Sequence, residues 1–353
     1  MSLLTLPNVV AALVVLSLNA YAVMGGADYG GGVWDLLASG PRKKAQRALI
    51  ADAIGPIWEA NHVWLILVVV LVFTCFPVAF ARLAVVLHVP ITLMLIGVVL
   101  RGSAFTFRTY DSKRDAVQRR WGTTFAIASV VTPVLLGVCL GALASGGVGE
   151  ADLARGFRSV LLDSWLTPFA LAVGLFTLVL FAFLAATYLT LEAATSARRD
   201  EEEALHDDFR RRALWSGVAV FAAALLVLLL AGAAAPRLRA GLTEGGWALA
   251  LHLVTAAAAL TALAALWTRR YAVARIAAIA QVSCILWGWA WAQFPYVVPP
   301  SLTIAAGAAP PITLALTLIG VAVGFTVLVP SLWYLFRIFK GRETAFQRVG
   351  EHQ

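Results

Sequence analysis

Long apolar stretches recur along this chain, and short polar linkers separate them. A helix needs about 20 mainly apolar residues to cross the hydrocarbon core of a bilayer. The runs that are long enough predict nine membrane-spanning helices, at residues 8–27, 58–79, 83–101, 122–145, 162–192, 213–235, 246–267, 272–294 and 312–337. We therefore expect one integral membrane domain over residues 1–353, of the all-α class. The expected arrangement is two groups of four helices and one peripheral helix.

The basic residues are distributed unequally between the two sets of linkers. Of the 27 Lys and Arg residues, five fall on the side that contains the linker after the second predicted span. These five are Arg82, Arg155, Arg158, Arg237 and Arg239. The other 22 lie in the opposite linkers or at the helix ends beside them. Because Lys and Arg accumulate in cytoplasmic loops, we expect the N-terminus outside and the C-terminus in the cytoplasm.

Composition supports the membrane assignment and argues against nucleic acid as a partner. Hydrophobic residues make up 61% of the chain and charged residues 13%, and the mean hydropathy is +0.85. The formal net charge of +8 is explained by cytoplasmic loops that face anionic lipid, so no nucleic-acid partner is expected. The longest polar segment, residues 198–212, is too short and too charged to form a domain, and it predicts a solvated helical linker.

Ionisable side chains within the spans are the candidates for function, because a charge is costly in the membrane. Asp28 lies in a glycine-rich segment at the inner end of the first predicted span. Glu59, Asn61 and His62 lie at the inner end of the second span, and Arg101 ends the third. All of them are expected at the same cytoplasmic depth.

Two interpretations of these residues stay open. Asp28 and Arg101 can pair and tie the first and third spans together, with Asn61 close by. Alternatively, the acids form the entrance of a proton path. Glu59 and His62 are the better relay candidates, because they are three residues apart on a helix and both can titrate.

The intramembrane histidines do not predict a haem site in this chain. His62, His88 and His252 are the candidates for axial ligands, but the sequence offers no evident partner for any of them. The three cysteines, at positions 75, 139 and 284, lie inside spans without Cys-x-x-Cys spacing. No metal site is expected.

The motifs around these residues resemble a known family, subunit II of the cytochrome bd quinol oxidases. The segments that carry the resemblance are Gly26-x-Asp28-x-Gly30, Gly55-Pro56-x-Trp58-Glu59-x-Asn61-x-Val63-Trp64, Arg101-x-x-x-Phe105-x-Phe107-Arg108 and Gln293-Phe294-Pro295-Tyr296 with Pro299-Pro300. They extend over nearly the whole chain. The run around Glu59 is more similar to the cyanide-insensitive branch than to the branch with Asp at this position.

The resemblance implies a subunit of a terminal respiratory oxidase in the cytoplasmic membrane of a bacterium or archaeon. It implies a heterodimer in which subunit I carries haems b and d and oxidises quinol, and in which dioxygen is reduced to water with cytoplasmic protons. For this chain it implies no ligated haem, a part of the proton path at Glu59 with Asp28 nearby, and a dioxygen route near Trp64. A tightly bound quinone and a small accessory subunit are further implications, and their contacts stay open.

Two other classes of function compete with this interpretation. A stand-alone transporter would also place acids beside an arginine in the membrane, but it typically shows broken helices in matching positions of two halves. A purely structural membrane scaffold would need no proton role. Glu59 and His62 at one depth favour the proton role.

Overall fold

The computed structural model describes residues 4–55, 58–110, 115–149, 156–195 and 199–350. Nearly all of them are helical. The elements, in chain order, are α1 (Leu6–Leu36), α2 (Lys43–Ile54), α3 (Trp58–Cys75), α4 (Pro77–Val86), α5 (His88–Tyr110), α6 (Asp115–Ala144), the π-helical turn η2 (Ser159–Asp163), α7 (Pro168–Thr195), α8 (Arg199–Ala234), α9 (Pro236–Thr243), α10 (Gly246–Trp267), α11 (Tyr271–Gln293), β1 (Tyr296–Val298), β2 (Leu302–Thr303), α12 (Ile304–Gly307) and α13 (Pro311–Gly350). The predicted all-α polytopic membrane protein is confirmed.

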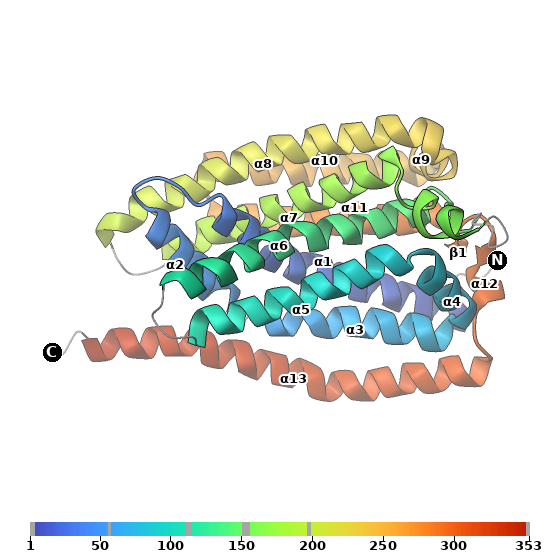
Figure 1. Ribbon diagram of the computed structural model, residues 1–353, viewed down its shortest axis with the longest axis horizontal. Coiled ribbons are helices and arrows are strands. Elements are labelled where there is room, and N and C mark those ends of the chain that lie inside the picture. The colour runs from blue at the N-terminus through green and yellow to red at the C-terminus, as the bar shows by residue number, and fades with distance from the viewer. Residues whose placement is uncertain (1–3, 56–57, 111–114, 150–155, 196–198, 351–353) are drawn as a thin grey trace.

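The long helices form one bundle (Figure 1). Among the described residues, eight helices are long and apolar enough to cross a membrane, and the α3–α4 pair provides a ninth candidate. The helices run side by side, and the two chain termini lie at opposite ends of the bundle. This arrangement agrees with an odd number of crossings.

The second predicted span differs from the structure at its C-terminal end. We predicted one helix over residues 58–79 and the next over 83–101. In the structure α3 ends at Cys75, and α4 turns away from it by 117°. Pro77 is the cause, because it has no amide hydrogen to continue the α3 ladder but suits the first turn of a new helix. α5 then starts at His88 and continues to Tyr110, beyond the predicted end at 101.

The first helix is also longer than predicted, because the glycine-rich segment continues α1 to Leu36 rather than ending it near residue 27. These glycines bring α1 close to its neighbours. A Cβ atom added to Gly30 would lie 2.0 Å from the carbonyl oxygen of Phe181 in α7. One added to Gly32 would lie 2.1 Å from Oγ of Ser129 in α6. The segment therefore serves as a packing surface in the middle of the bundle.

The helices associate in two groups. One contains α1, α3, α5 and α6, and the other contains α7, α8, α10 and α11, with α7 packed against both α1 and α6. α13 lies along the edge of the bundle, where it packs against α3 and α1 (Figure 1). At the end of the bundle that carries the N-terminus, β1 and β2 form a short antiparallel hairpin, in which Tyr296 faces Thr303 and Val298 faces Leu302.

The helix expected at residues 198–212 is confirmed from Arg199 onward, but in the described part it is not a separate solvated linker. α8 begins at Arg199 and continues without a break into the predicted sixth span. Leu205 and Phe209 are buried, with 7% and 0% exposure, and Ala213 continues the same stripe at 0%. Residues four apart lie on one face of a helix, so the charged segment is an amphipathic extension of α8.

Candidate functional site

A buried polar cluster lies where α1, α3, α5 and α6 meet. It consists of Asp28, Asn61, Arg101 and Ser129, one from each helix, and each of them is at most 2% exposed. A lone charge at such a position would be very unfavourable, so charged groups survive there only when they are paired and hydrogen-bonded.

Arg101 and Asp28 form the charged pair of this cluster. The guanidinium donates from Nη2 to Oδ1 at 2.5 Å and from Nη1 to Oδ2 at 2.7 Å. Nη2 also donates to the backbone carbonyl of Asp28 at 3.0 Å, and Nδ2 of Asn61 donates to Oδ2 at 2.7 Å. The carboxylate thus accepts three hydrogen bonds from two neighbouring helices, and such charge-assisted bonds are among the strongest in proteins.

The remaining side of the guanidinium is also occupied. Its Nε donates to Oγ of Ser129 at 2.9 Å, and that hydroxyl donates to the carbonyl oxygen of Phe125 at 2.7 Å. The Cζ atom of Arg101 lies 4.7 Å from the ring centroids of both Tyr29 and Phe125. Aromatic faces attract a cation most strongly where water is excluded, so both rings stabilise the buried charge.

The structure brings together three of the residues selected from the sequence: Asp28, Asn61 and Arg101. It places Asp28 and Arg101 inside their helices rather than at the ends, because α1 and α5 continue past them, whereas Asn61 lies in the first turn of α3 as expected. Sequence reasoning missed Ser129 and the two aromatic rings of Tyr29 and Phe125. A polar residue in the middle of an apolar span was the signal that could have identified Ser129.

The other selected residues lie on α3. His62 is half-buried and interacts electrostatically with both Asp28 and Arg101. Trp64 packs against Phe325 of α13, with ring centroids 5.8 Å apart. The side chain of Glu59 lies outside the described residues, so its proposed relay contact with His62 stays a prediction.

Two buried polar atoms on the same face of α3 have no hydrogen-bond partner among the described residues. They are Oδ1 of Asn61 and Nε1 of Trp64, three residues apart. One is an acceptor and the other a donor. Buried polar atoms of this kind usually bind water or a ligand, so this face of α3 can hold polar molecules next to Asp28.

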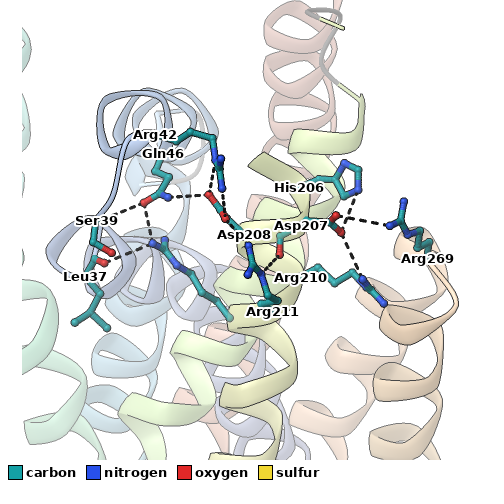
Figure 2. A network of polar contacts seen from close by, with 11 residues as sticks. Leu37, Ser39, Arg42, Gln46, His206, Asp207, Asp208, Arg210, Arg211 and Arg269 are labelled. Atoms are coloured by element: carbon teal, nitrogen blue, oxygen red, sulfur yellow. Dashed lines mark hydrogen bonds and ion pairs between the residues drawn. The ribbon is translucent and has the colours of Figure 1, made fainter. Parts of the chain in front are cut away.

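A second polar network ties α8 to α2 at the end of the bundle that carries α2 (Figure 2). Arg42 donates to Asp208 from Nε at 2.9 Å and from Nη2 at 2.7 Å. Nε2 of Gln46 and Nη2 of Arg211 each donate to the same carboxylate at 3.0 Å. The hydrogen bonds that Arg42 donates to Asp208, and then the negative charge of that carboxylate, raise the pKa of Arg42. Arg212 donates to Oε1 of Gln46 at 2.8 Å and closes the network.

The neighbouring Asp207 points the other way along the same end of the bundle (Figure 2). Its carboxylate lies 3.4 Å from Arg210 and 3.6 Å from Arg269, which belongs to the turn between α10 and α11. Nε2 of His206 lies 3.5 Å from the same carboxylate. Two consecutive aspartates on α8 therefore contact different parts of the chain.

The described residues contain no group of three or more His, Cys, Asp or Glu side chains that could hold a metal ion. His88, at the start of α5, and His252, in α10, are both exposed on the outside of the bundle. The ring of His252 donates from Nδ1 to the carbonyl of Ala248 at 2.6 Å. These surroundings do not form a haem pocket, and the expectation that haem is held elsewhere stays a prediction.

Comparison with known proteins gives a consistent family signal. The family model described as cytochrome bd terminal oxidase subunit II matches residues 6–339. The putative cytochrome bd menaquinol oxidase subunit II of Bacillus subtilis is 22% identical over 326 residues, which cover 90% of this chain and 91% of that protein. Cytochrome bd-I ubiquinol oxidase subunit 2 of Escherichia coli is 29% identical over 182 residues, which cover 51% of this chain and 47% of that protein.

A solved structure shares the fold. A chain of the bd oxidase from Geobacillus thermodenitrificans superposes with a TM-score of 0.74 at 24% sequence identity. The superposition covers 95% of this chain and 99% of that one. The likeness therefore extends to the whole bundle, including α13.

Proposed function

Because this chain belongs to the family of subunit II of the cytochrome bd terminal oxidases, we propose that it binds a haem-bearing subunit I and supplies part of its proton path. The family assigns it to a quinol oxidase complex in the membrane, in which catalysis belongs to the complex. The proposed reaction takes electrons from quinol and protons from the cytoplasm, and it reduces dioxygen to water. Haems b and d are proposed to lie on subunit I.

The observation that carries the proposal is the buried Asp28–Arg101 pair at the meeting point of four helices. A carboxylate that accepts three hydrogen bonds, two of them from a guanidinium, is held firmly in one position. We therefore propose that Asp28 acts as a fixed negative charge beside the path and holds the helices in place. This role is compatible with the stabilisation of subunit I by a rigid partner surface.

The proton itself is proposed to move through Glu59 and His62. A relay group must exist in both charged and neutral forms near the working pH, which suits a histidine and an intramembrane carboxyl group. His62 lies close enough to Asp28 and Arg101 to interact electrostatically with both. The unpartnered polar atoms of Asn61 and Trp64 support a role for water next to this relay, because they provide an acceptor and a donor.

Three finer assignments come from the family resemblance and belong to the proposal. Trp64 is proposed to lie beside the lateral route of dioxygen, at the contact between α3 and α13. A quinone is proposed to bind tightly to this subunit, and a small accessory subunit can complete the complex. The 22 basic residues on one side of the chain support an N-terminus outside and a C-terminus in the cytoplasm.

The experiment is quinol-driven dioxygen consumption by the complex of this chain with subunit I, measured against pH. Glu59→Gln keeps the size and hydrogen bonding of the side chain but cannot titrate. We expect turnover to fall by about tenfold or more, with normal haem content and assembly. Glu59→Asp should retain most of the activity. Glu244→Gln, at the exposed end of α9, is the matched control and should change nothing.

Two results would contradict the proposal at different levels. A fully assembled Glu59→Gln complex with unchanged turnover at every pH would remove the proton role and leave the family assignment intact. A haem spectrum from the isolated chain that disappears on replacement of His62 or His88 would instead overturn the assignment of the haems to subunit I.

A further inference from the structure

The turn between α10 and α11 carries a surplus of positive charge. Arg269 is 52% exposed, and its neighbour Arg270 is exposed without an ionic partner in the described part of the chain. Arg210 of α8 reaches the same turn, and Asp207 is the acid that contacts this group. Arg210 and Arg269 thus contact Asp207 (Figure 2), and Arg270 adds a third positive charge to the turn. An anion would balance the excess.

Arg210 fixes the shape of this turn. Its Nε donates to the carbonyl of Leu266 at 2.8 Å, and its Nη2 donates to the carbonyl of Trp267 at 3.0 Å. These bonds satisfy the last carbonyl groups of α10, which have no helical partner. The guanidinium is 18% exposed. Arg210 therefore has a structural role in the turn, whereas the exposed side chains of Arg269 and Arg270 can reach a ligand.

The backbone amides at the start of α11 add hydrogen-bond donors, and their partial charge is also positive. The amide of Ala274 makes the first helical bond of α11, to the carbonyl of Arg270 at 3.0 Å. Within the described residues, the amides of Tyr271, Ala272 and Val273 have no such bond. Ala272 and Val273 are exposed. Free amides at the start of a long helix attract anions, and phosphate groups in particular.

A buried side chain points independently to a missing partner. Tyr271 is only 9% exposed, and its hydroxyl has no hydrogen-bond partner among the described residues. Tyr271 follows Arg269 and Arg270 directly in the chain, so its side chain starts from the same turn. The ring of His206 lies 5.7 Å from the Tyr271 ring, and its Nε2 lies 3.5 Å from the Asp207 carboxylate, so Tyr271 borders the cluster. Buried polar groups are normally satisfied, so a ligand or its water shell fits here.

The surface beside the turn is suited to lipid. Trp267, which ends α10, is 71% exposed, and Trp215 of α8 is 75% exposed. Further along the same helices, Leu260 and Val218 are exposed at 67% and 56%. Exposed tryptophans are typical of the headgroup level of a membrane, where they border the acyl chains. The ligand that matches both the charge and the apolar surface is a phospholipid.

We propose that the α10–α11 turn binds the phosphate group of an anionic phospholipid. Arg269, Arg270 and the first amides of α11 bind the phosphate, and the Tyr271 hydroxyl contributes a donor at the buried side. Trp267 packs beside the part of the acyl chains that is nearest to the headgroup. The site lies on α8, α10 and α11, away from the Asp28–Arg101 cluster, and it does not depend on the proposed proton role.

The test is lipid retention by the purified complex, measured by native mass spectrometry with dioleoyl phosphatidylglycerol and dioleoyl phosphatidylcholine as probes. Arg269→Asn combined with Arg270→Gln removes two charges, and asparagine tolerates the left-handed backbone of Arg269, whose φ is 60°. The matched control is Lys43→Gln with Lys44→Gln, two exposed lysines on α2. Tyr271→Phe removes the buried hydroxyl and leaves both arginines.

We expect phosphatidylglycerol to be retained in preference to phosphatidylcholine. The arginine variant should retain at least roughly tenfold less phosphatidylglycerol than the unaltered chain. Tyr271→Phe should also retain less phosphatidylglycerol than the unaltered chain. The lysine control should retain as much as the unaltered chain. Equal retention of the two lipids, or equal losses in the arginine and lysine variants, would overturn the proposal. Retention of water-soluble glycerophosphate as strongly as phosphatidylglycerol would also overturn it, because the site would then bind a free phosphate rather than a lipid.

Discussion

Arg101 binds Asp28 through two parallel hydrogen bonds of 2.5 and 2.7 Å, so that α5 and α1 share one buried ion pair. Both side chains are almost completely withdrawn from solvent, at 2% and 0% exposure. Burial of either charge without the other would be strongly unfavourable. The pair is therefore a requirement for the packing of the first helix group, whatever else Asp28 does.

Removal of one member of this pair should be strongly destabilising. Asp28→Asn leaves the guanidinium of Arg101 buried without a counter-charge, and we expect a loss of about 3–5 kcal/mol in the free energy of unfolding. The measurements are the thermal unfolding of the chain in detergent and its yield in membranes. Ser129→Ala should cost less, about 1–3 kcal/mol, because it leaves the buried Nε–H of Arg101 without its acceptor while the rest of the guanidinium keeps its partners.

Removal of both charges gives the matched test. Asp28→Asn with Arg101→Gln should be less destabilised than the sum of the single changes, since no uncompensated charge is left. If the loss in the free energy of unfolding of the double variant equals the sum of the losses of the two single variants, the two groups do not depend on each other.

Gly30 should tolerate no side chain. An added Cβ would lie 2.0 Å from the carbonyl oxygen of Phe181, and that backbone cannot rotate away. We expect Gly30→Ala to destabilise the chain by about 1–3 kcal/mol, seen as a lower unfolding temperature. Gly320→Ala in α13 is the control, because nothing lies within 4 Å of its added Cβ and alanine favours a helix. Equal effects at the two positions would show that the contact between α1 and α7 is looser than the structure indicates.

Asp208 should hold α2 against α8. Asp208→Asn removes the charge that Arg42, Arg211 and Gln46 bind. We expect amide hydrogen exchange in α2 to accelerate by a factor on the order of five to ten, with exchange in α7 unchanged. Arg158→Gln breaks an ion pair whose side chains are 87% and 61% exposed, and it should leave α2 unaffected. Unchanged exchange in the Asp208 variant would mean that apolar packing alone positions α2.

The orientation in the membrane can be tested with single cysteines and a membrane-impermeant maleimide. Cysteines at Lys44 and Arg211 should react from the cytoplasmic side, and those at Thr243 and Ala306 from the outside. All four positions are exposed. The unequal distribution of basic residues is the reason for this expectation. Labelling of Lys44 and Thr243 positions from the same side would contradict the arrangement of the spans.

The hydropathy pattern predicted the class of fold and most of the helices, but it misjudged where helices bend and end. It could not separate α3 from α4, because the apolar run continues through Pro77 and only the backbone changes direction. It ended the first helix near residue 27, because glycines are poor helix formers in isolation. In the structure their lack of a side chain allows close packing against α7, which outweighs that propensity.

The candidate site was predictable in part for a similar reason. Asp28, Asn61 and Arg101 are rare polar residues in apolar spans. Because an unpaired polar or charged group is costly in the membrane, their proximity could be inferred from the sequence. Tyr29, Phe125 and the network around Asp208 could not be inferred in this way. Their roles depend on the rotation of each helix about its axis, and that rotation is set by packing between segments far apart in the sequence.

The adjacent positions of Asp207 and Asp208 have a mechanical consequence for α8. Successive side chains on a helix point about 100° apart, and here they bind on opposite flanks, to the α10–α11 turn and to α2. A twist of α8 about its long axis in either direction would stretch both contacts at once. The charged end of this helix is therefore held on two flanks, and a rotation of α8 about its axis would disturb its contacts with α2 and with the α10–α11 turn together.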